Sequence, residues 1–148
     1  MNHVFEALDS YSTDISKIHE VSFAEPWNDA VFLEYMNKST TRFYVARLKG
    51  QIIGFILIEA VDNEGEILTL ATHPDHRQNG VARGLLGHVL DILSQQGFER
   101  LLLEVAFDNQ AALSLYQGLG FEPCGIRKAY YHRPNSTPID AHVLNYVF

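Results

Sequence analysis

One short segment of the chain, residues 77–84, constrains the fold more than any other part of the sequence. It reads Arg-Gln-Asn-Gly-Val-Ala-Arg-Gly and lies between an apolar run typical of a strand, Ile67–Thr72, and the helical run Leu85–Leu90. The N-terminus of a helix has free backbone N–H groups and the positive end of the helix dipole, and both attract an anion. The order of strand, glycine-bearing basic loop and helix therefore predicts an α/β protein with a site for a phosphate-bearing ligand.

The bulk composition narrows the class of protein. A chain of 148 residues with 47% hydrophobic and 20% charged residues is typical of one globular domain, so we expect a single domain over 1–148. The formal net charge of −7 argues against general nucleic-acid binding, which needs basic patches, and permits a cationic substrate. No apolar window reaches the length of a membrane span. We therefore expect a cytoplasmic protein that is a monomer or a weak dimer and binds neither membrane nor nucleic acid.

Residues that bind metals or form disulfides are sparse. The single cysteine, Cys124, cannot form an internal disulfide, and its residue type is more often a small hydrophobe than a nucleophile. The seven histidines are scattered, with no His-x-x-x-His or paired-cysteine spacing. We therefore expect no metal site.

Hydrophobic periodicity and turn residues predict the element order β-α-α-β-β-β-α-β-α-β-β, one mixed α/β domain. Asn28 is expected to cap the second helix, Lys49-Gly50 to join a hairpin, and Gly97 and Gly120 to end the last two helices. The apolar run 101–106 reads as a strand covered on both faces. The expected strands are 2–8, 42–48, 51–60, 66–72, 101–106, 121–131 and 139–148, and the expected helices are 13–23, 29–37, 81–96 and 109–119.

This order, with Arg77-x-x-Gly80-x-Ala82 between the fourth strand and the third helix, resembles the GNAT superfamily of acetyl-CoA-dependent N-acetyltransferases. Further segments resemble its RimI-type ribosomal-protein-alanine N-acetyltransferases, and they are Pro26-Trp27, residues 71–77, 103–105, 109–121 and 126–131, and Asp140-Ala141. The resemblance implies a GNAT fold: a single, mostly antiparallel mixed sheet flanked by about four helices. Ala82 stands where glycine is common, and the loop 133–139, which borders the acceptor side, differs in composition from that of the family.

The resemblance also implies how acetyl-CoA would be bound. Backbone N–H groups of the 77–84 loop would hold the pyrophosphate, and the strand before the loop would pair with the pantetheine arm like an added strand. The helix cap Asn109 would touch the pantetheine. The implied cofactor-binding residues are Leu70, Ala71, Thr72, Arg77, Gln78, Asn79, Gly80, Val81, Ala82, Arg83 and Asn109. On the residues alone, the two glycines could simply serve a tight turn.

Glu104 and Tyr116 are the implied catalytic pair, the glutamate as general base and the tyrosine as the acid that protonates the CoA thiolate. Glu104 interrupts an apolar strand, and a lone carboxylate there needs a partner or a purpose. Its alternative is an exposed edge position or a structural ion pair with Arg100 or Arg127. The alternative for Tyr116 is a half-buried aromatic with a satisfied hydroxyl.

The expected activity is transfer of acetyl to the free α-amine of a protein N-terminus by direct attack. By resemblance, the acceptor is the N-terminal alanine of a small-subunit ribosomal protein, with Tyr130 and Tyr131 lining the acceptor groove. Trp27 is expected in the core. Two alternatives stay open: an acetyltransferase for a small-molecule amine or a lysine side chain, and a non-catalytic acyl-CoA-binding module.

Overall fold

A computed structural model of the protein describes residues 2–131 and 137–148. The element order is the predicted one. The strands are β1 Val4–Ala7, β2 Thr41–Leu48, β3 Gln51–Val61, β4 Glu64–Thr72, β5 Arg100–Ala106, β6 Glu122–Tyr131 and β7 Ile139–Val147; the helices are α1 Thr13–Ser22, α2 Asp29–Met36, α3 Val81–Gln95 and α4 Gln110–Gly118, with a 3₁₀ turn over Pro74–His76.

The seven strands form one sheet in the order β1-β2-β3-β4-β5-β7-β6. Neighbours pair antiparallel except β4 and β5, which α3 connects as a parallel crossover. This arrangement confirms the predicted GNAT fold, a mostly antiparallel mixed sheet with four helices.

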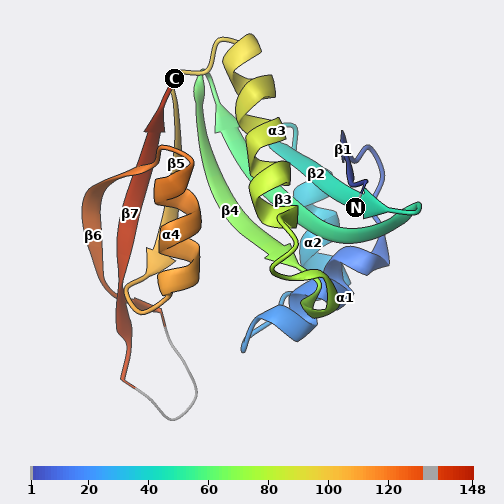
Figure 1. Ribbon diagram of the computed structural model, residues 1–148, viewed down its shortest axis with the longest axis horizontal. Helices are drawn as coiled ribbons and strands as arrows, with labels where there is room; N and C mark the ends of the chain where they lie inside the picture. The colour runs from blue at the N-terminus through green and yellow to red at the C-terminus, as the bar shows by residue number, and fades with distance from the viewer. Residues whose placement is uncertain (1, 132–136) are drawn as a thin grey trace.

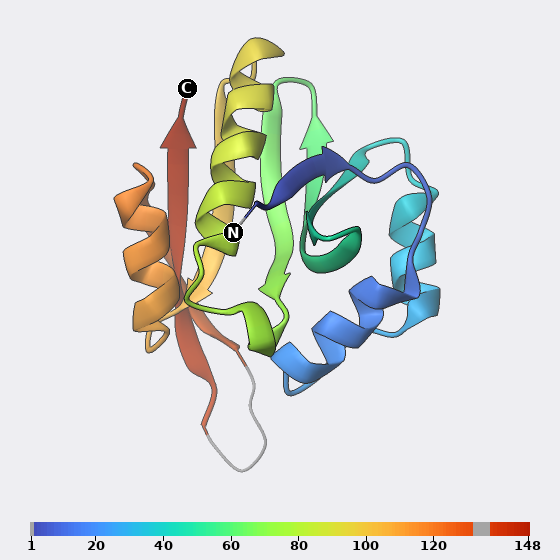
Figure 2. The same cartoon turned by 45° about the vertical axis from the view of Figure 1, so that its right-hand side comes forward.

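Two apolar clusters cover the two faces of the sheet. The larger contains the inward faces of α3 and α4, packed on β5 residues such as Leu103 and Val105. The smaller joins α1 and α2 to Phe43, Phe55 and Leu57 of β2 and β3. In Figure 2, α4 lies on one side of α3 and the α1–α2 pair lies on the other. The first half of the sheet is therefore covered on both faces, and β5 to β7 on the α4 face.

Local signals explain most element ends. The Asn28 side chain accepts a hydrogen bond from the Val31 N–H, which confirms the predicted cap of α2. Lys49 and Gly50 have φ of 52° and 82°, the left-handed pair that a two-residue hairpin requires. Gly97, at φ 79°, ends α3 while the Phe98 N–H bonds back to the Leu93 carbonyl, as a Schellman motif requires.

Two strand predictions need correction. β4 begins at Glu64 rather than Glu66, because Glu64 and Gly65 already pair with both β3 and β5. β5 is not covered on both faces: its alternate residues Leu102 and Glu104 are only partly buried, since none of the described helices lies over them on that side. None of the helices among the described residues is long and apolar enough to cross a membrane.

Candidate active site

β4 and β5 separate partway along their length, and this separation creates the candidate site. Their parallel pairing runs from Glu64 and Arg100 only as far as Glu66 and Leu102, and Figure 1 shows the two strands moving apart beyond that point. β4 meanwhile stays paired to β3 up to Thr72. The β5-facing edge of residues 67–72 is therefore left for a ligand to pair with, as an added strand would.

A bulge lies within this open stretch of β4. Leu57 and Ile58, consecutive in β3, oppose Thr69 and Ile67, so Leu68 is an extra residue. Beyond the bulge lie Leu70, Ala71 and Thr72, the residues predicted to pair with the pantetheine arm. The structure places all three on the open edge.

The loop before α3 has the geometry of an anion site. Gln78 and Gly80 have φ of 64° and 76°, and Gly80 caps α3 without a side-chain hydrogen bond. The first backbone bond of the helix runs from the Gly84 N–H to the Gly80 carbonyl at 2.9 Å. The N–H groups of Val81, Ala82 and Arg83 consequently have no partner within the helix, and the space around Gly80 is open.

The two arginines that flank this loop have other neighbours. The Arg77 guanidinium donates to the Thr72 carbonyl at 3.1 Å and to Ser22 Oγ at 3.0 Å, so it ties the end of β4 to α1. The Arg83 side chain reaches α4, where a Cβ added to Gly118 would lie 2.8 Å from its Nη2. What this loop offers an anion is therefore mainly its backbone N–H groups, those of Asn79 and its neighbours, because the Arg77 side chain is engaged elsewhere.

Glu104 lies on the β5 face opposite Leu103 and Val105, because successive strand residues alternate. Its side chain is 16% exposed and forms an ion pair with Arg127 Nη1 at 2.9 Å. Of the two ion pairs weighed from the sequence, the one with Arg127 is present, whereas Arg100 pairs with Glu64 at 3.1 Å. An ion pair does not prevent a carboxylate from accepting a proton once the partner moves away.

Tyr116 occupies the other face, buried on α4 in the larger cluster, where its ring meets Phe121 edge to face. Burial, with a smaller contribution from Tyr131, raises the pKa of the Tyr116 hydroxyl. A tyrosine with a raised pKa keeps its proton at neutral pH, and a hydroxyl that is to protonate a thiolate must carry one. Asn109 caps the same helix by accepting from the Ala112 N–H, as predicted.

Glu104 and Tyr116 thus come from opposite faces of the sheet. Groups on opposite faces can act on one ligand only where the sheet is open, and the β4–β5 pairing ends at Leu102, two residues before Glu104. Tyr131 connects the two sides, since its hydroxyl donates to the Glu104 carbonyl at 3.1 Å and it also affects the Tyr116 pKa. Tyr130 is half-exposed next to it, at a ring-to-ring distance of 5.2 Å.

Acidic residues lie beside Glu104, and the sequence did not predict this acidic face. Glu66 on β4 lies directly across from Glu59 on β3, and its pKa is raised by burial and by the charges of Glu104 and Glu59. A surface hollow of about 430 Å³ continues this acidic face, and carboxylates dominate its lining, which comprises Glu59, Asp62, Glu64, Glu66 and Glu99 together with Val61, Asn63, Gly65 and Leu102. Cross-strand register brings these residues together, so their spacing along the chain does not predict the acidic face.

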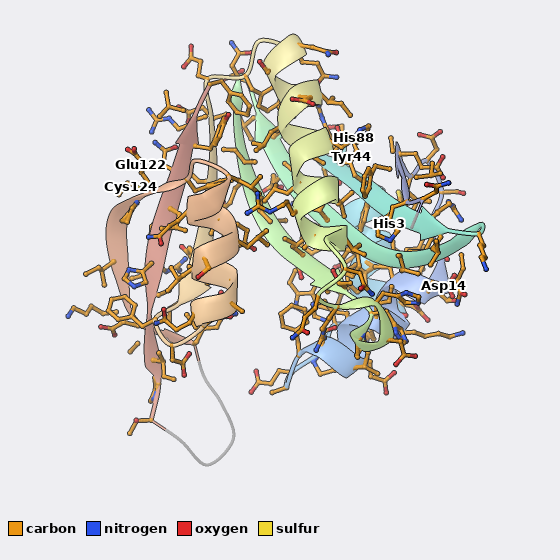
Figure 3. The ribbon with its side chains drawn as sticks, viewed as in Figure 1. His3, Asp14, Tyr44, His88, Glu122 and Cys124 are labelled. Carbon is orange, nitrogen blue, oxygen red and sulfur yellow. The ribbon has the colours of Figure 1, made fainter. Side chains whose placement is uncertain are left out.

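Other candidates lie elsewhere. Cys124 is exposed on β6, at the outer edge of the sheet beside Glu122 (Figure 3). Trp27 packs on the smaller cluster, as expected. Residues 132–136 of the acceptor-side loop lie outside the described residues. Among those that are described, no three His, Cys, Asp or Glu side chains are grouped to hold a metal ion.

Comparison with known proteins agrees with this geometry. The acetyltransferase (GNAT) family model matches residues 9–121. The [ribosomal protein bS18]-alanine N-acetyltransferase of Escherichia coli is 32% identical over 114 residues, which is 77% of this chain and 76% of the relative.

Solved structures show the same similarity. The crystal structure of the ribosomal-protein-S18-alanine N-acetyltransferase from Escherichia coli superposes with a TM-score of 0.90 at 28% identity, covering 99% of this chain and 94% of that one. A chain from the NatC complex bound to Gag peptide and CoA gives a TM-score of 0.82 at 26% identity, over 100% of this chain and 99% of that one. These similarities exclude the alternative of a non-catalytic acyl-CoA-binding module. The chain belongs to the GNAT family of acetyltransferases and is an acetyl-CoA-dependent N-acetyltransferase.

Proposed function

We propose that this enzyme acetylates the free α-amine of a protein N-terminus, and that its natural acceptor is the N-terminal alanine of a small-subunit ribosomal protein in the cytoplasm. The observation that carries the proposal is the 32% identity, over 77% of the chain, to an enzyme named for acetylating the alanine of ribosomal protein bS18. The acidic face around Glu104 suits an acceptor whose first residues are basic.

Acetyl-CoA supplies an acetyl group activated as a thioester. The uncapped N-terminus of α3 fits its phosphates, and the open edge of β4 fits its pantetheine arm. A backbone N–H on that edge would polarise the acetyl carbonyl. The residues proposed to bind it remain those of the two segments, 70–72 and 77–83, together with Asn109.

In the proposed mechanism, Glu104 takes a proton from the acceptor ammonium, directly or through a water molecule. The neutral amine nitrogen then forms its bond to the acetyl carbon as the carbon–sulfur bond breaks. Tyr116 donates its hydroxyl proton to the departing sulfur, and the second proton that the nitrogen loses on becoming an amide is passed on through water and restores that hydroxyl. An α-ammonium has a pKa of about 7.7–8.0, so at neutral pH part of the acceptor is already the neutral amine, and the base removes the proton from the remainder.

A panel of acceptors tests the substrate. It contains peptides with free N-terminal Ala, Ser, Met or Gly, the same peptides α-blocked but with a free lysine, and small polyamines; acetyl transfer is detected by mass spectrometry. We expect acetylation of free N-termini, strongest on Ala. Transfer only to lysine or polyamines would overturn the substrate assignment.

A second candidate function, acetylation of a polycationic small amine, is favoured by the acidic hollow next to Glu66. The same panel separates the two functions, because a polyamine lacks the peptide backbone that the first requires.

Two variants test the mechanism. Glu104→Gln and Tyr116→Phe are each expected to lower kcat by about a hundredfold or more, the usual contribution of a positioned acid or base. Glu64→Gln, which removes another ion-paired glutamate, and Tyr146→Phe, whose ring also meets Phe121, are the matched controls. Full turnover of both active-site variants would show that the assigned roles are wrong.

A further inference from the structure

The Glu104 carboxylate, proposed as the general base, already forms an ion pair. Arg127 Nη1 donates to Glu104 Oε1 at 2.9 Å, and the Arg127 side chain is 55% exposed whereas that of Glu104 is 16% exposed. The guanidinium therefore approaches the carboxylate from the solvent side. An acceptor amine that enters from solvent meets Arg127 before it reaches Glu104.

An irregular piece of backbone places Arg127 there. In the pairing of β6 with β7, Arg127 opposes Ala141 and Tyr131 opposes Ile139, so three residues of β6 face the single residue Asp140. Within this bulge Ala129 has φ 50°, and its N–H donates to Asp140 Oδ1 at 2.7 Å. A left-handed alanine fixed by a side-chain hydrogen bond indicates a defined local structure rather than a frayed strand end.

The bulge gives Arg127 a second contact. Tyr130 comes three residues later and would point to the opposite face of a regular strand. Instead its ring lies 4.0 Å from the Arg127 guanidinium carbon, a cation–π distance. Burial and, after it, the Glu104 charge raise the pKa of Tyr130, so the Tyr130 hydroxyl lies near the same carboxylate.

The groups around Glu104 favour a single cation beside its carboxylate, because the nearby charged residues other than Arg127 are acidic. Burial and then the Glu104 charge raise the pKa of Glu66 on β4, so Glu66 lies near Glu104, and the charge of Glu59 on β3 raises that pKa further. The β7 residue opposite Glu104 is the uncharged Val143, and β6 supplies Arg127, Tyr130 and Tyr131. A guanidinium and an acceptor ammonium are both pure donors with a positive charge, and both need the oxygens of Glu104.

We propose that Arg127 is a positioning residue that occupies Glu104 until an acceptor amine replaces it, an inference that rests on the proposed role of Glu104 as the base. The Arg127 side of the ion pair is more than half exposed, and a solvent-screened ion pair contributes little free energy, so the exchange costs little. After release, the guanidinium keeps its contact with the Tyr130 ring. Every acceptor therefore binds in competition with Arg127, whatever the length of its peptide.

Arg127→Met tests the competition. Steady-state kinetics at saturating acetyl-CoA would use two acceptors, an octapeptide beginning with alanine and alaninamide, which has the same amine without the following peptide. We expect KM to fall about three- to fivefold for both acceptors by the same factor, with kcat unchanged. Arg127→Lys, which restores a competing cation, should return KM toward the wild-type value. Calorimetric binding of each acceptor to the complex with CoA checks that KM reports affinity.

The matched control is Arg100→Met. Arg100 also pairs with a glutamate, Glu64, at half exposure, and its loss changes the net charge equally, so its KM should equal that of the wild type. A KM that rises for the octapeptide but not for alaninamide would overturn the inference, because Arg127 would then bind the acceptor beyond its first residue.

An equal loss of kcat for both acceptors, or no change at all, would also overturn it. Arg127→Gln is the second variant should the methionine variant fail to fold. A wild-type enzyme that acetylates no N-terminal peptide overturns the proposed function, and this inference with it. An active wild type with an unaffected Arg127→Met variant overturns this inference alone.

Discussion

His19 makes the stability of this enzyme dependent on pH. The imidazole is 3% exposed and packs against the rings of Phe23, Trp27, Phe32 and Phe55. Its Nδ1 accepts a hydrogen bond from the Trp27 N–H at 3.0 Å, which a protonated Nδ1 cannot do. Burial lowers the pKa of His19 from 6.5 to about 4.

The sign and size of the effect follow from linkage. Below pH 6.5 the unfolded chain takes up a proton at this residue that the folded protein does not, so acid favours unfolding until the folded pKa is reached. At pH 5 the difference in proton binding at His19 lowers the free energy of unfolding by about 2 kcal/mol relative to pH 7.5. For a chain of this length that corresponds to a Tm lower by about 4–8 °C.

His19→Asn separates this effect from the other acid-titrating groups. The Asn side-chain oxygen can accept from the Trp27 N–H as Nδ1 does, but the amide does not titrate. The lost ring packing costs the variant the same free energy at every pH, so only the difference between the two pH profiles matters. Urea unfolding from pH 7.5 to 5 should show the wild type losing about 2 kcal/mol more than the variant. Parallel profiles would show that the reasoning is wrong.

Two glycine positions give further predictions. Gly80→Ala forces a left-handed alanine at φ 76° in open space, so we expect the affinity for acetyl-CoA, measured by calorimetry, to fall several-fold. Gly87→Ala is the control: its added methyl also meets open space, but its φ is not left-handed, so the affinity should stay unchanged. Gly84→Ala drives a methyl group into the ring of Phe5 and should lower the free energy of unfolding by about 1–3 kcal/mol. Phe5→Leu in the same chain should recover part of that loss in thermal melts, and strictly additive losses would contradict the collision.

Where the sequence predicted the structure correctly, the signal was local. The Asn28 and Asn109 caps, the Lys49-Gly50 hairpin and the Gly97 helix end each depend on a few neighbouring residues. Where it was wrong, a partner distant in the chain decided the outcome. β4 starts early because β5 pairs with it, and one face of β5 stays partly open because none of the helices in the described part of the chain lies over it.

The candidate site shows the same division. The sequence by itself determined the glycine-bearing turn before the helix that begins at Val81, and it placed an acidic residue, Glu104, within an apolar strand. Only the tertiary structure decided that β4 and β5 separate beyond Glu66, that Tyr116 is buried on the opposite face of the sheet from Glu104, and that a bulge places Arg127 on Glu104. The physical reason is that turns and caps are satisfied by hydrogen bonds within a few residues, whereas strand register and bulges depend on backbone groups far apart in the chain.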